Sequence, residues 1–358
     1  METIIKHWKN HPNLDLKLKE ELEHLDQKAL QDAFYTDVAF GTAGMRGLLG
    51  VGTNRLNVHT IRKANVAFAK YLLQYPQSTK TGVAIAYDNR YMSVEFAQES
   101  ARVLAMYNIP SYVFPSLRPT PELSFAVRHL KCVGGIVITA SHNPKEYNGY
   151  KVYDQEGCQL VPHLIEQVID EINKIEDALD IKVVLSEAQE KLIHTLDESV
   201  DLAYYQKVES IKLRKDLDFS NIKLIFSPQH GTAHEGVNAL YKKMGVPFIE
   251  VKEQANPDPA FSNTKTPNPE ESAAYDLAIE YAKRENADAA ICTDPDADRL
   301  GVVVKQKNDY VLLTGNQTGS ILIDYLLSTK TELKTMPQNP VLFNTVVTSD
   351  LGEKVAND

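Results

Sequence analysis

The sequence predicts an α/β protein built from successive domains with mixed, mainly parallel sheets, the last of them incomplete. Short apolar runs of strand length alternate along the chain with amphipathic stretches of helical length. This alternation begins near residue 82 and restarts near residue 222, which indicates at least two α/β units. A chain of 358 residues is also longer than one ordinary hydrophobic core requires.

The first predicted domain covers residues 1–206. We expect helices where apolar residues recur at helical spacing: up to residue 30, at 60–75, at 93–107 and at 121–130, followed by a polar helix after Pro162. Ser93 is the expected N-cap of the helix at 93–107. We expect buried strands at 82–88, 111–115 and 134–140, with a hairpin extension at 148–160. The glycine-rich stretch Phe40–Arg55 is expected to be a loop.

The second predicted domain covers residues 207–311, and a third begins at 312. In the second domain we expect strands at 222–228, 247–251 and 288–293, and helices at 233–245 and 271–286. In residues 312–358 we expect one helix at 318–327 and one strand at 341–347. So few elements cannot close a core, so the third domain is predicted to be incomplete.

The composition is that of a globular protein with an acidic surface. Hydrophobic residues make up 43% of the chain and charged residues 24%. The formal net charge of −10 repels a phosphate backbone, so we expect no nucleic-acid partner. An anionic substrate would have to be attracted by a local cluster of cations.

Neither a membrane segment nor a cysteine framework is indicated. No apolar stretch approaches the ~20 residues that span a bilayer, so we expect no membrane partner. The three cysteines, Cys132, Cys158 and Cys292, are far apart and form no CxxC pair. Reduced thiols, and an N-terminus without the apolar core of a signal peptide, favour a cytoplasmic location.

An acidic loop follows the strand expected at 288–293. In "TDPDADRLG" three aspartates occupy alternate positions, Asp294, Asp296 and Asp298. Alternate side chains of an extended or looped backbone point the same way, and three converging carboxylates need a cation. Oxygen ligands favour Mg²⁺ or Ca²⁺. An acidic surface turn is the alternative, which the rigid Pro295 disfavours.

Arg299 helps to define the kind of metal site. An EF-hand requires glycine at this position and a glutamate at the position of Lys305, so that motif is excluded. The haloacid-type phosphatase motif is excluded as well, because the required threonine is missing. A guanidinium beside a metal loop can bind phosphate oxygens bidentately. The loop therefore favours phosphoryl transfer.

A second polar segment, "TASHNPKEYNGYKVY", follows the strand that we expect near residue 138. It contains Ser141, but Thr139 and Asn143 stand where a hydrolase nucleophile elbow needs glycine. The chain has no GxxxxGK[ST] motif, so it is not a P-loop enzyme. The glycine-rich stretch adds Arg46, a cation on a backbone that can approach an anion closely.

Together these segments resemble the α-D-phosphohexomutase superfamily, which includes phosphoglucomutases and phosphomannomutases. "TASHNPKEYNGYKVY" resembles its active-site serine loop, "DPDADR" its metal-binding loop, and "GTAGMRG" its N-terminal arginine loop. "SPQHG" (Ser227–Gly231) is similar to a fourth family segment. The resemblance covers essentially the whole chain and is greatest to the bacterial phosphoglucomutases, near the subgroup that includes phosphopentomutases.

The resemblance implies a role for each of these residues. Ser141 would be a phosphoserine that passes its phosphoryl group to a sugar phosphate and takes back the other phosphate of the resulting bisphosphate. The metal, expected to be Mg²⁺, would be held by Ser141, Asp294, Asp296 and Asp298. Catalytic roles would fall to Ser141, Lys151, His142 and Arg46, and substrate binding to Arg46, Asn143, Lys151, His230 and Arg299.

Three of these roles have alternatives or conditions. His142 could brace the loop instead of moving a proton. His230 fits loop positioning better than proton transfer. Lys151 can act as a base only if burial or neighbouring cations lower its pKa, which Mg²⁺ and two arginines would do.

The expected function is that of a phosphoglucomutase, which interconverts glucose 1-phosphate and glucose 6-phosphate through glucose 1,6-bisphosphate. The family has four domains, and we expect that domain 4 and the sugar-recognition loop of domain 3 are absent here, so that the fragment lacks full activity. Phosphomannomutase and phosphopentomutase activity remain open. So do a phosphoserine-dependent phosphohydrolase, which a site open to water would favour, and a non-catalytic sugar-phosphate-binding domain.

Overall fold

The computed structural model describes residues 1–41 and 44–357 and divides into two compact units. Unit 1 comprises residues 1–204, 258–260 and 295–298. Unit 2 comprises residues 205–257, 261–294 and the chain from 299 onward. The boundary between Tyr204 and Tyr205 lies within one helix, and the domain boundaries at 207 and 312 stay predictions. Thr42 and Ala43 of the "GTAGMRG" segment, and Asp358, lie outside the described residues.

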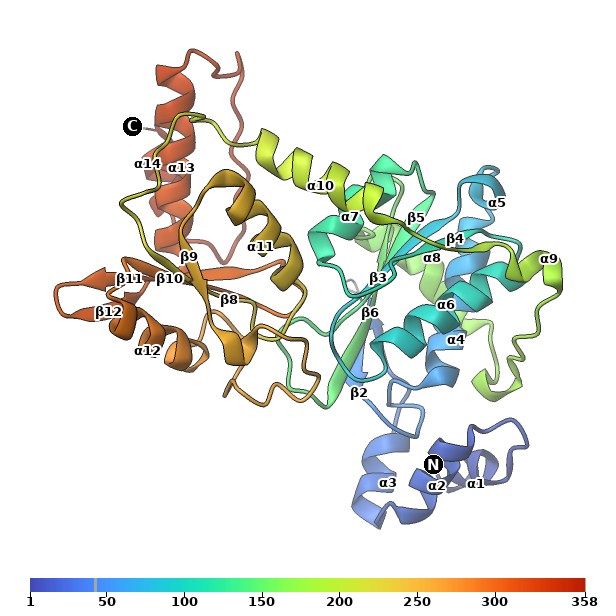
Figure 1. The fold of residues 1–358 in the computed structure, drawn as a ribbon. Coiled ribbons are helices and arrows are strands. Elements are labelled where there is room, and N and C mark those ends of the chain that lie inside the picture. The colour runs from blue at the N-terminus through green and yellow to red at the C-terminus, as the bar shows by residue number, and fades with distance from the viewer. Residues whose placement is uncertain (42–43, 358) are drawn as a thin grey trace. The chain divides into compact units, whose positions relative to one another are not determined.

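Unit 1 is built around a seven-stranded mixed sheet with the order β1-β2-β6-β5-β3-β4-β7 (Figure 1). Its strands are β1 (Phe40–Gly41), β2 (Gly44–Leu48), β3 (Val83–Tyr87), β4 (Ser111–Val113), β5 (Gly134–Ile138), β6 (Tyr147–Tyr153) and β7 (Ile193–Thr195). Strands β5, β3, β4 and β7 run parallel, whereas β6, β2 and β1 join by antiparallel pairing.

Helices cover both faces of this sheet because its central strands are apolar on both sides. They are α4 (Val58–Leu72), α5 (Ser78–Thr81), α6 (Ser93–Met106), α7 (Thr120–His129), α8 (Pro162–Asn173), α9 (Glu187–Glu190) and α10 (Glu198–Ser210). Ile85 of β3 packs in the cluster that contains residues of α4, α6 and α8, while its neighbour Ala84 packs in the cluster of α7. Successive side chains of one strand thus fill two cores.

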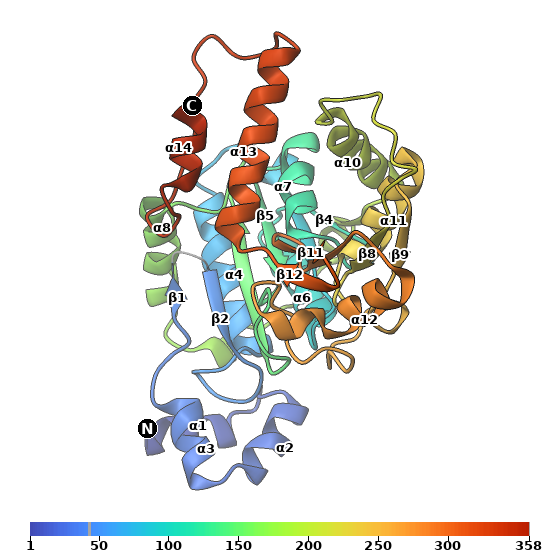
Figure 2. The ribbon, with the colours of Figure 1, turned by 90° about the vertical axis from the view of Figure 1, so that its left-hand side faces the viewer.

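Three short helices at the N-terminus form a separate hydrophobic cluster, to which Val51 and Leu179 also contribute (Figure 2). They are α1 (Glu2–Asn10), α2 (Leu16–His24) and α3 (Gln27–Phe34), and Trp8, Leu22 and Phe34 are buried between them. The expectation of one helix up to residue 30 was wrong. Asp15 and Asp26 each cap the start of a new helix by accepting hydrogen bonds from backbone N–H groups.

Unit 2 contains a five-stranded mixed sheet with the order β12-β11-β10-β8-β9. Its strands are β8 (Leu224–Ser227), β9 (Phe248–Glu250), β10 (Ala289–Thr293), β11 (Leu300–Gln306) and β12 (Asp309–Leu312). Its helices are α11 (Ala233–Met244), α12 (Asp276–Glu285), α13 (Gly315–Glu332) and α14 (Leu351–Asn357). Strands β9, β8 and β10 are parallel, and β11 and β12 extend the sheet in antiparallel fashion.

The predicted α/β class with mixed, mainly parallel sheets is confirmed, but three local predictions were wrong. Ser93 is not an N-cap, because it is the first residue of α6 and its hydroxyl donates to Asp88. The stretch 341–347 forms no strand, since it pairs with none of the described strands and its Phe343 is 91% exposed. The glycine-rich stretch is not only a loop, because it forms β1 and β2. No helix in the described part of the chain is long and apolar enough to cross a membrane.

Candidate active site

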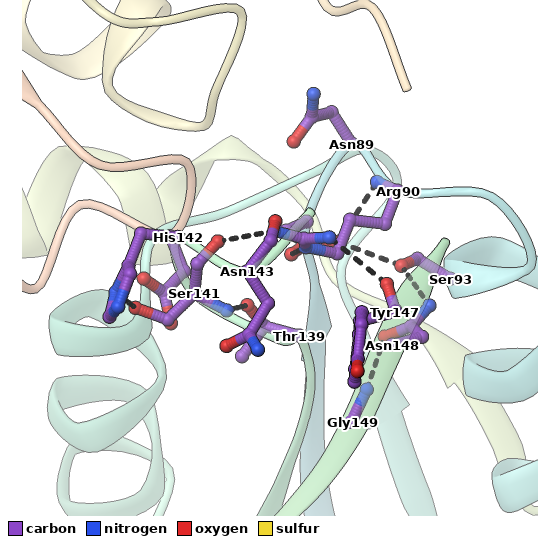
Figure 3. A network of polar contacts seen from close by, with 12 residues as sticks. Asn89, Arg90, Ser93, Thr139, Ser141, His142, Asn143, Tyr147, Asn148 and Gly149 are labelled. Atoms are coloured by element: carbon purple, nitrogen blue, oxygen red, sulfur yellow. Dashed lines mark hydrogen bonds and ion pairs between the residues drawn. The ribbon is translucent and has the colours of Figure 1, made fainter. Parts of the chain in front are cut away.

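The serine segment is the connection between β5 and β6 (Figure 3). Ser141 is buried and has a φ of 52°, a left-handed conformation that is uncommon for a residue other than glycine and is concentrated at functional sites. Its N–H donates to Thr139 Oγ1 over 2.8 Å, and its Oγ lies 3.1 Å from His142 Nδ1. The fold therefore holds this serine in a strained, defined geometry beside an imidazole.

Lys151 projects from β6, the strand that follows the serine segment. Its Nζ lies 3.0 Å from Asp296 Oδ2 and 3.5 Å from Asp298 Oδ2, and its side chain is only 9% exposed. Residues 295–298 belong to unit 1, so this contact lies within one compact unit. It joins the serine segment's hairpin to the acidic loop.

Thr120, at the start of α7, also holds the acidic loop, and the sequence analysis did not identify it. Its N–H donates to Asp296 O over 2.9 Å, and its Oγ1 lies 3.1 Å from Asp296 Oδ2. The only signal in the sequence is a threonine next to Pro121, which reads simply as a helix start. Thr120 thus fixes the position of one proposed metal ligand.

The acidic loop fits a divalent cation. Asp294, Asp296 and Asp298 each offer a carboxylate oxygen, and these oxygens lie within 4.8 Å of one another. Asp294 and Asp296 are completely buried, and buried carboxylates are costly unless cations neutralise them. With the ammonium of Lys151, these four groups sum to a charge of −2, which one Mg²⁺ or Ca²⁺ would balance.

Lys151 is held as an ammonium in this arrangement. Burial lowers its pKa, but the carboxylates of Asp296 and Asp298 raise it, and the net direction is upward from the usual value. We had expected the surroundings to lower the pKa of Lys151, but with the carboxylates of Asp296 and Asp298 beside it the pKa is raised. Neutralisation of the two carboxylates would remove the effect that keeps the proton on Lys151.

Arg46 lies on β2 and not on a loop, as we had expected. One of its Nη atoms donates to Asn143 Oδ1 over 2.9 Å, so the structure brings these two predicted residues together. Strand β2 can approach β6 this closely because position 44 is glycine: a Cβ there would lie 2.0 Å from Tyr150 O. The side chain of Arg46 is exposed and able to meet an anion.

His230 and Arg299 lie in unit 2. His230 follows strand β8, and Arg299 directly precedes β11 at the end of the acidic loop. Strands β8 and β10 are parallel neighbours, so the loop that carries His230 and the one that begins with Asp294 leave the same edge of the sheet. His230 Nδ1 lies 2.9 Å from Asn256 O, and because a carbonyl oxygen only accepts, Nδ1 is the donor of this hydrogen bond. Arg299 donates to Glu270 over 3.1 Å.

Two further charged residues that the sequence analysis missed support the serine segment. Asp88 and Arg90 follow β3, their side chains are completely buried, and Arg90 donates to Ser141 O over 2.7 Å. Burial raises the pKa of Asp88, which Arg90 and hydrogen bonds from its neighbours counteract. The sequence held one signal for these two residues, because both are charged and follow a buried strand closely.

Comparison with known proteins identifies the family to which the chain belongs. Residues 37–179 match the family model described as phosphoglucomutase/phosphomannomutase, alpha/beta/alpha domain I, and residues 202–307 match the model of domain II. A phosphoglucomutase of Staphylococcus aureus (strain MRSA252) is 37% identical over 328 residues, which are 91% of this chain and 58% of that protein. The chain thus spans less than two thirds of this relative.

Solved structures share the fold. The open form of parafusin, a phosphoglucomutase from Paramecium, superposes with a TM-score of 0.64 at 20% identity, over 90% of this chain and 61% of that one. A phosphoglucomutase/phosphomannomutase family protein from Burkholderia thailandensis gives a TM-score of 0.64 at 22% identity, over 79% and 57%. The expected resemblance is confirmed: this chain belongs to the α-D-phosphohexomutase superfamily.

Proposed function

We propose that this chain carries the phosphoryl-transfer part of a phosphoglucomutase, which interconverts glucose 1-phosphate and glucose 6-phosphate. The observation that carries the proposal is the 3.0 Å contact between Lys151 Nζ and Asp296 Oδ2. It supports a site in which the serine segment and the acidic loop act together. The 37% identity to a phosphoglucomutase supports glucose as the sugar.

In the proposed reaction, the phosphoryl group on Ser141 Oγ is transferred to the free hydroxyl of the sugar phosphate. This gives glucose 1,6-bisphosphate and the free serine, and return of the other phosphate to Ser141 gives the isomer. Mg²⁺, held by Asp294, Asp296, Asp298 and a phosphoserine oxygen, would offset the charge on the transferring group. The same bisphosphate would charge a serine that is not yet phosphorylated.

The side chains around Ser141 suit the remaining tasks. His142 Nδ1, 3.1 Å from Ser141 Oγ, can hold the proton that the hydroxyl loses when it takes up phosphate and can return it afterwards. Lys151 is proposed as the acid/base group for the sugar hydroxyl. Arg46, linked to Asn143, and Arg299 are proposed to supply cations for phosphate oxygens. His230 is proposed as a further substrate-binding residue.

Intact mass spectrometry tests this proposal. The protein is incubated with glucose 1,6-bisphosphate and Mg²⁺, and we expect it to gain one phosphoryl group. Ser141→Ala should gain none, whereas Ser186→Ala, which changes an exposed helix cap in the same unit, should match the wild type. A wild type that stays unmodified, or a Ser141→Ala variant that is phosphorylated, would contradict the proposal. Rapid release of inorganic phosphate without isomerisation would favour a phosphohydrolase instead.

A further inference from the structure

Arg90, which follows β3, holds the backbone of the serine segment through its guanidinium (Figure 3). One terminal nitrogen donates to Pro144 O over 2.8 Å and to Tyr147 O over 3.0 Å. The other donates to Ser141 O over 2.7 Å and to Asn143 O. A single planar guanidinium therefore holds three backbone carbonyls of the serine segment and a fourth at the first residue of β6.

Arg90 is itself fixed from the opposite side. Its Nε lies 3.3 Å from Asp88 Oδ2, and its own N–H donates to Asp88 Oδ1 over 2.9 Å. Ser93 Oγ donates to the same Oδ1, and Asn148 Nδ2 donates to Ser93 Oγ. These bonds link the segment after β3 to both ends of the serine segment, so the guanidinium has little freedom to rotate.

The number of donors decides what Arg90 can do. A guanidinium has five N–H groups. Four are directed at carbonyl oxygens, and the fifth, on Nε, is buried 3.3 Å from Asp88 Oδ2 in a side chain with no exposed surface. This leaves no donor for a substrate phosphate, so Arg90 can act on the reaction only through the backbone of the serine segment.

We propose that Arg90 is a positioning residue that keeps Ser141 in its left-handed conformation and thereby aims its Oγ for phosphoryl transfer. The inference rests on the proposed function and adds to it a residue outside the serine segment. A residue other than glycine leaves the left-handed region unless its surroundings hold it there. The bond to Ser141 O and the bond to Asn143 O restrain the first and the third peptide groups that follow Ser141.

Three variants separate this role from general stabilisation. Arg90→Ala removes all four bonds, and Arg90→Lys keeps the charge but offers three donors without the planar fork. Arg62→Ala is the control, because it removes a partly buried arginine of unit 1 that is ion-paired elsewhere. Its Nε lies 2.5 Å from Glu99 Oε1, and both residues are far from the serine segment in sequence. We expect phosphoryl uptake by Ser141 to slow roughly 10²-fold in both Arg90 variants, in line with the effect of a ~1 Å misplacement.

Chemical rescue and hydrogen exchange complete the test. Millimolar methylguanidine should restore part of the rate of phosphoryl uptake in Arg90→Ala. It should not increase the rate of uptake in Arg62→Ala. Amides of residues 139–149 should exchange faster in the Arg90 variants only, and this readout needs neither phosphate nor turnover. Unchanged exchange in this segment, or Arg90→Lys with wild-type uptake, would overturn the inference. A wild type without uptake refutes the proposed function, and the exchange data still test Arg90.

Discussion

Lys151 Nζ lies 3.0 Å from Asp296 Oδ2, although 145 residues separate the two in the chain. This contact makes the ammonium and a divalent cation compete for the same carboxylates, because Lys151 also lies 3.5 Å from Asp298 Oδ2. A cation bound to the three aspartates would weaken the hold of these carboxylates on the lysine proton. Metal binding and the acid/base behaviour of Lys151 are therefore expected to be coupled.

The first prediction concerns the affinity for Mg²⁺. Lys151→Ala removes the competing positive charge, so we expect the carboxylates to bind Mg²⁺ about tenfold more tightly, on the scale of one close charge interaction. Phosphoryl uptake by Ser141 should nevertheless fall, because the proposed acid/base group is gone. Isothermal titration calorimetry with Mg²⁺ and the mass assay measure the two effects.

Lys145→Ala is the control for this prediction, since Lys145 is an exposed lysine of the connection that precedes β6. It should leave the affinity for Mg²⁺ close to that of the wild type. Weaker Mg²⁺ binding by Lys151→Ala than by Lys145→Ala would mean that the lysine supports the cation and does not compete with it.

The second prediction concerns the effect of the metal on stability. A ligand that binds only the folded state stabilises it by about 2.7 kcal/mol at a hundredfold excess over Kd. Mg²⁺ should therefore raise the thermal midpoint of the wild type, and EDTA should reverse the rise. Asp296→Asn should abolish it, whereas Asp180→Asn, at an exposed carboxylate of unit 1, should not. An equal rise in both variants would argue against the acidic loop as the site.

The third prediction is a pH dependence that originates at His59. Burial, followed by the nearby Arg62, lowers the pKa of His59 from 6.5 to about 4. The unfolded chain therefore binds the proton first as the pH falls from 6.5 towards 4, and the free energy of unfolding decreases over this window. Between pH 7 and pH 5 we expect a loss of about 2 kcal/mol from this residue.

Urea unfolding at the two pH values measures this loss. His59→Gln should make the free energy of unfolding less dependent on pH over this interval. Glutamine does not reproduce the packing of the imidazole against Trp8, so only the difference between the two pH values is compared within each variant. His163→Gln, at an exposed histidine, should keep the wild-type slope. A His59→Gln variant with an unchanged slope would refute the assignment.

The parts of the site that follow directly from strands could be predicted from the sequence. The apolar runs that became β5 and β10 were recognisable. Ser141 lies three residues after the end of β5, and Asp294 directly follows β10. Polar residues that follow a strand lie at the carboxyl end of that strand, and this holds for any arrangement of the other elements. The roles proposed for these side chains stay predictions.

The contacts that depend on distant segments could not be predicted. Arg90 and Thr120 act on loops that lie 51 and 176 residues away, and no local pattern marks such pairs. Arg46 was expected on a loop because the glycines around it disfavour strands in isolation. In the fold, pairing with β6 outweighs that preference. The stretch 341–347 shows the reverse, since strand propensity forms no strand without a partner.

The last prediction tests the close approach on which the serine segment depends. A Cβ on Gly149 would lie 2.2 Å from Thr139 O, a backbone atom that cannot move without displacing the start of the serine segment. We expect Gly149→Ala to lower the free energy of unfolding by roughly 2–3 kcal/mol, as overpacking does, and to slow phosphoryl uptake.

Gly319→Ala is the matched control, because nothing lies within 4 Å of its Cβ position in α13. There, alanine should stabilise the helix by about 0.5–1 kcal/mol. Equal effects of the two substitutions in urea unfolding would show that the backbone at residue 149 can relax, and that the geometry of the serine segment does not depend on glycine at this position.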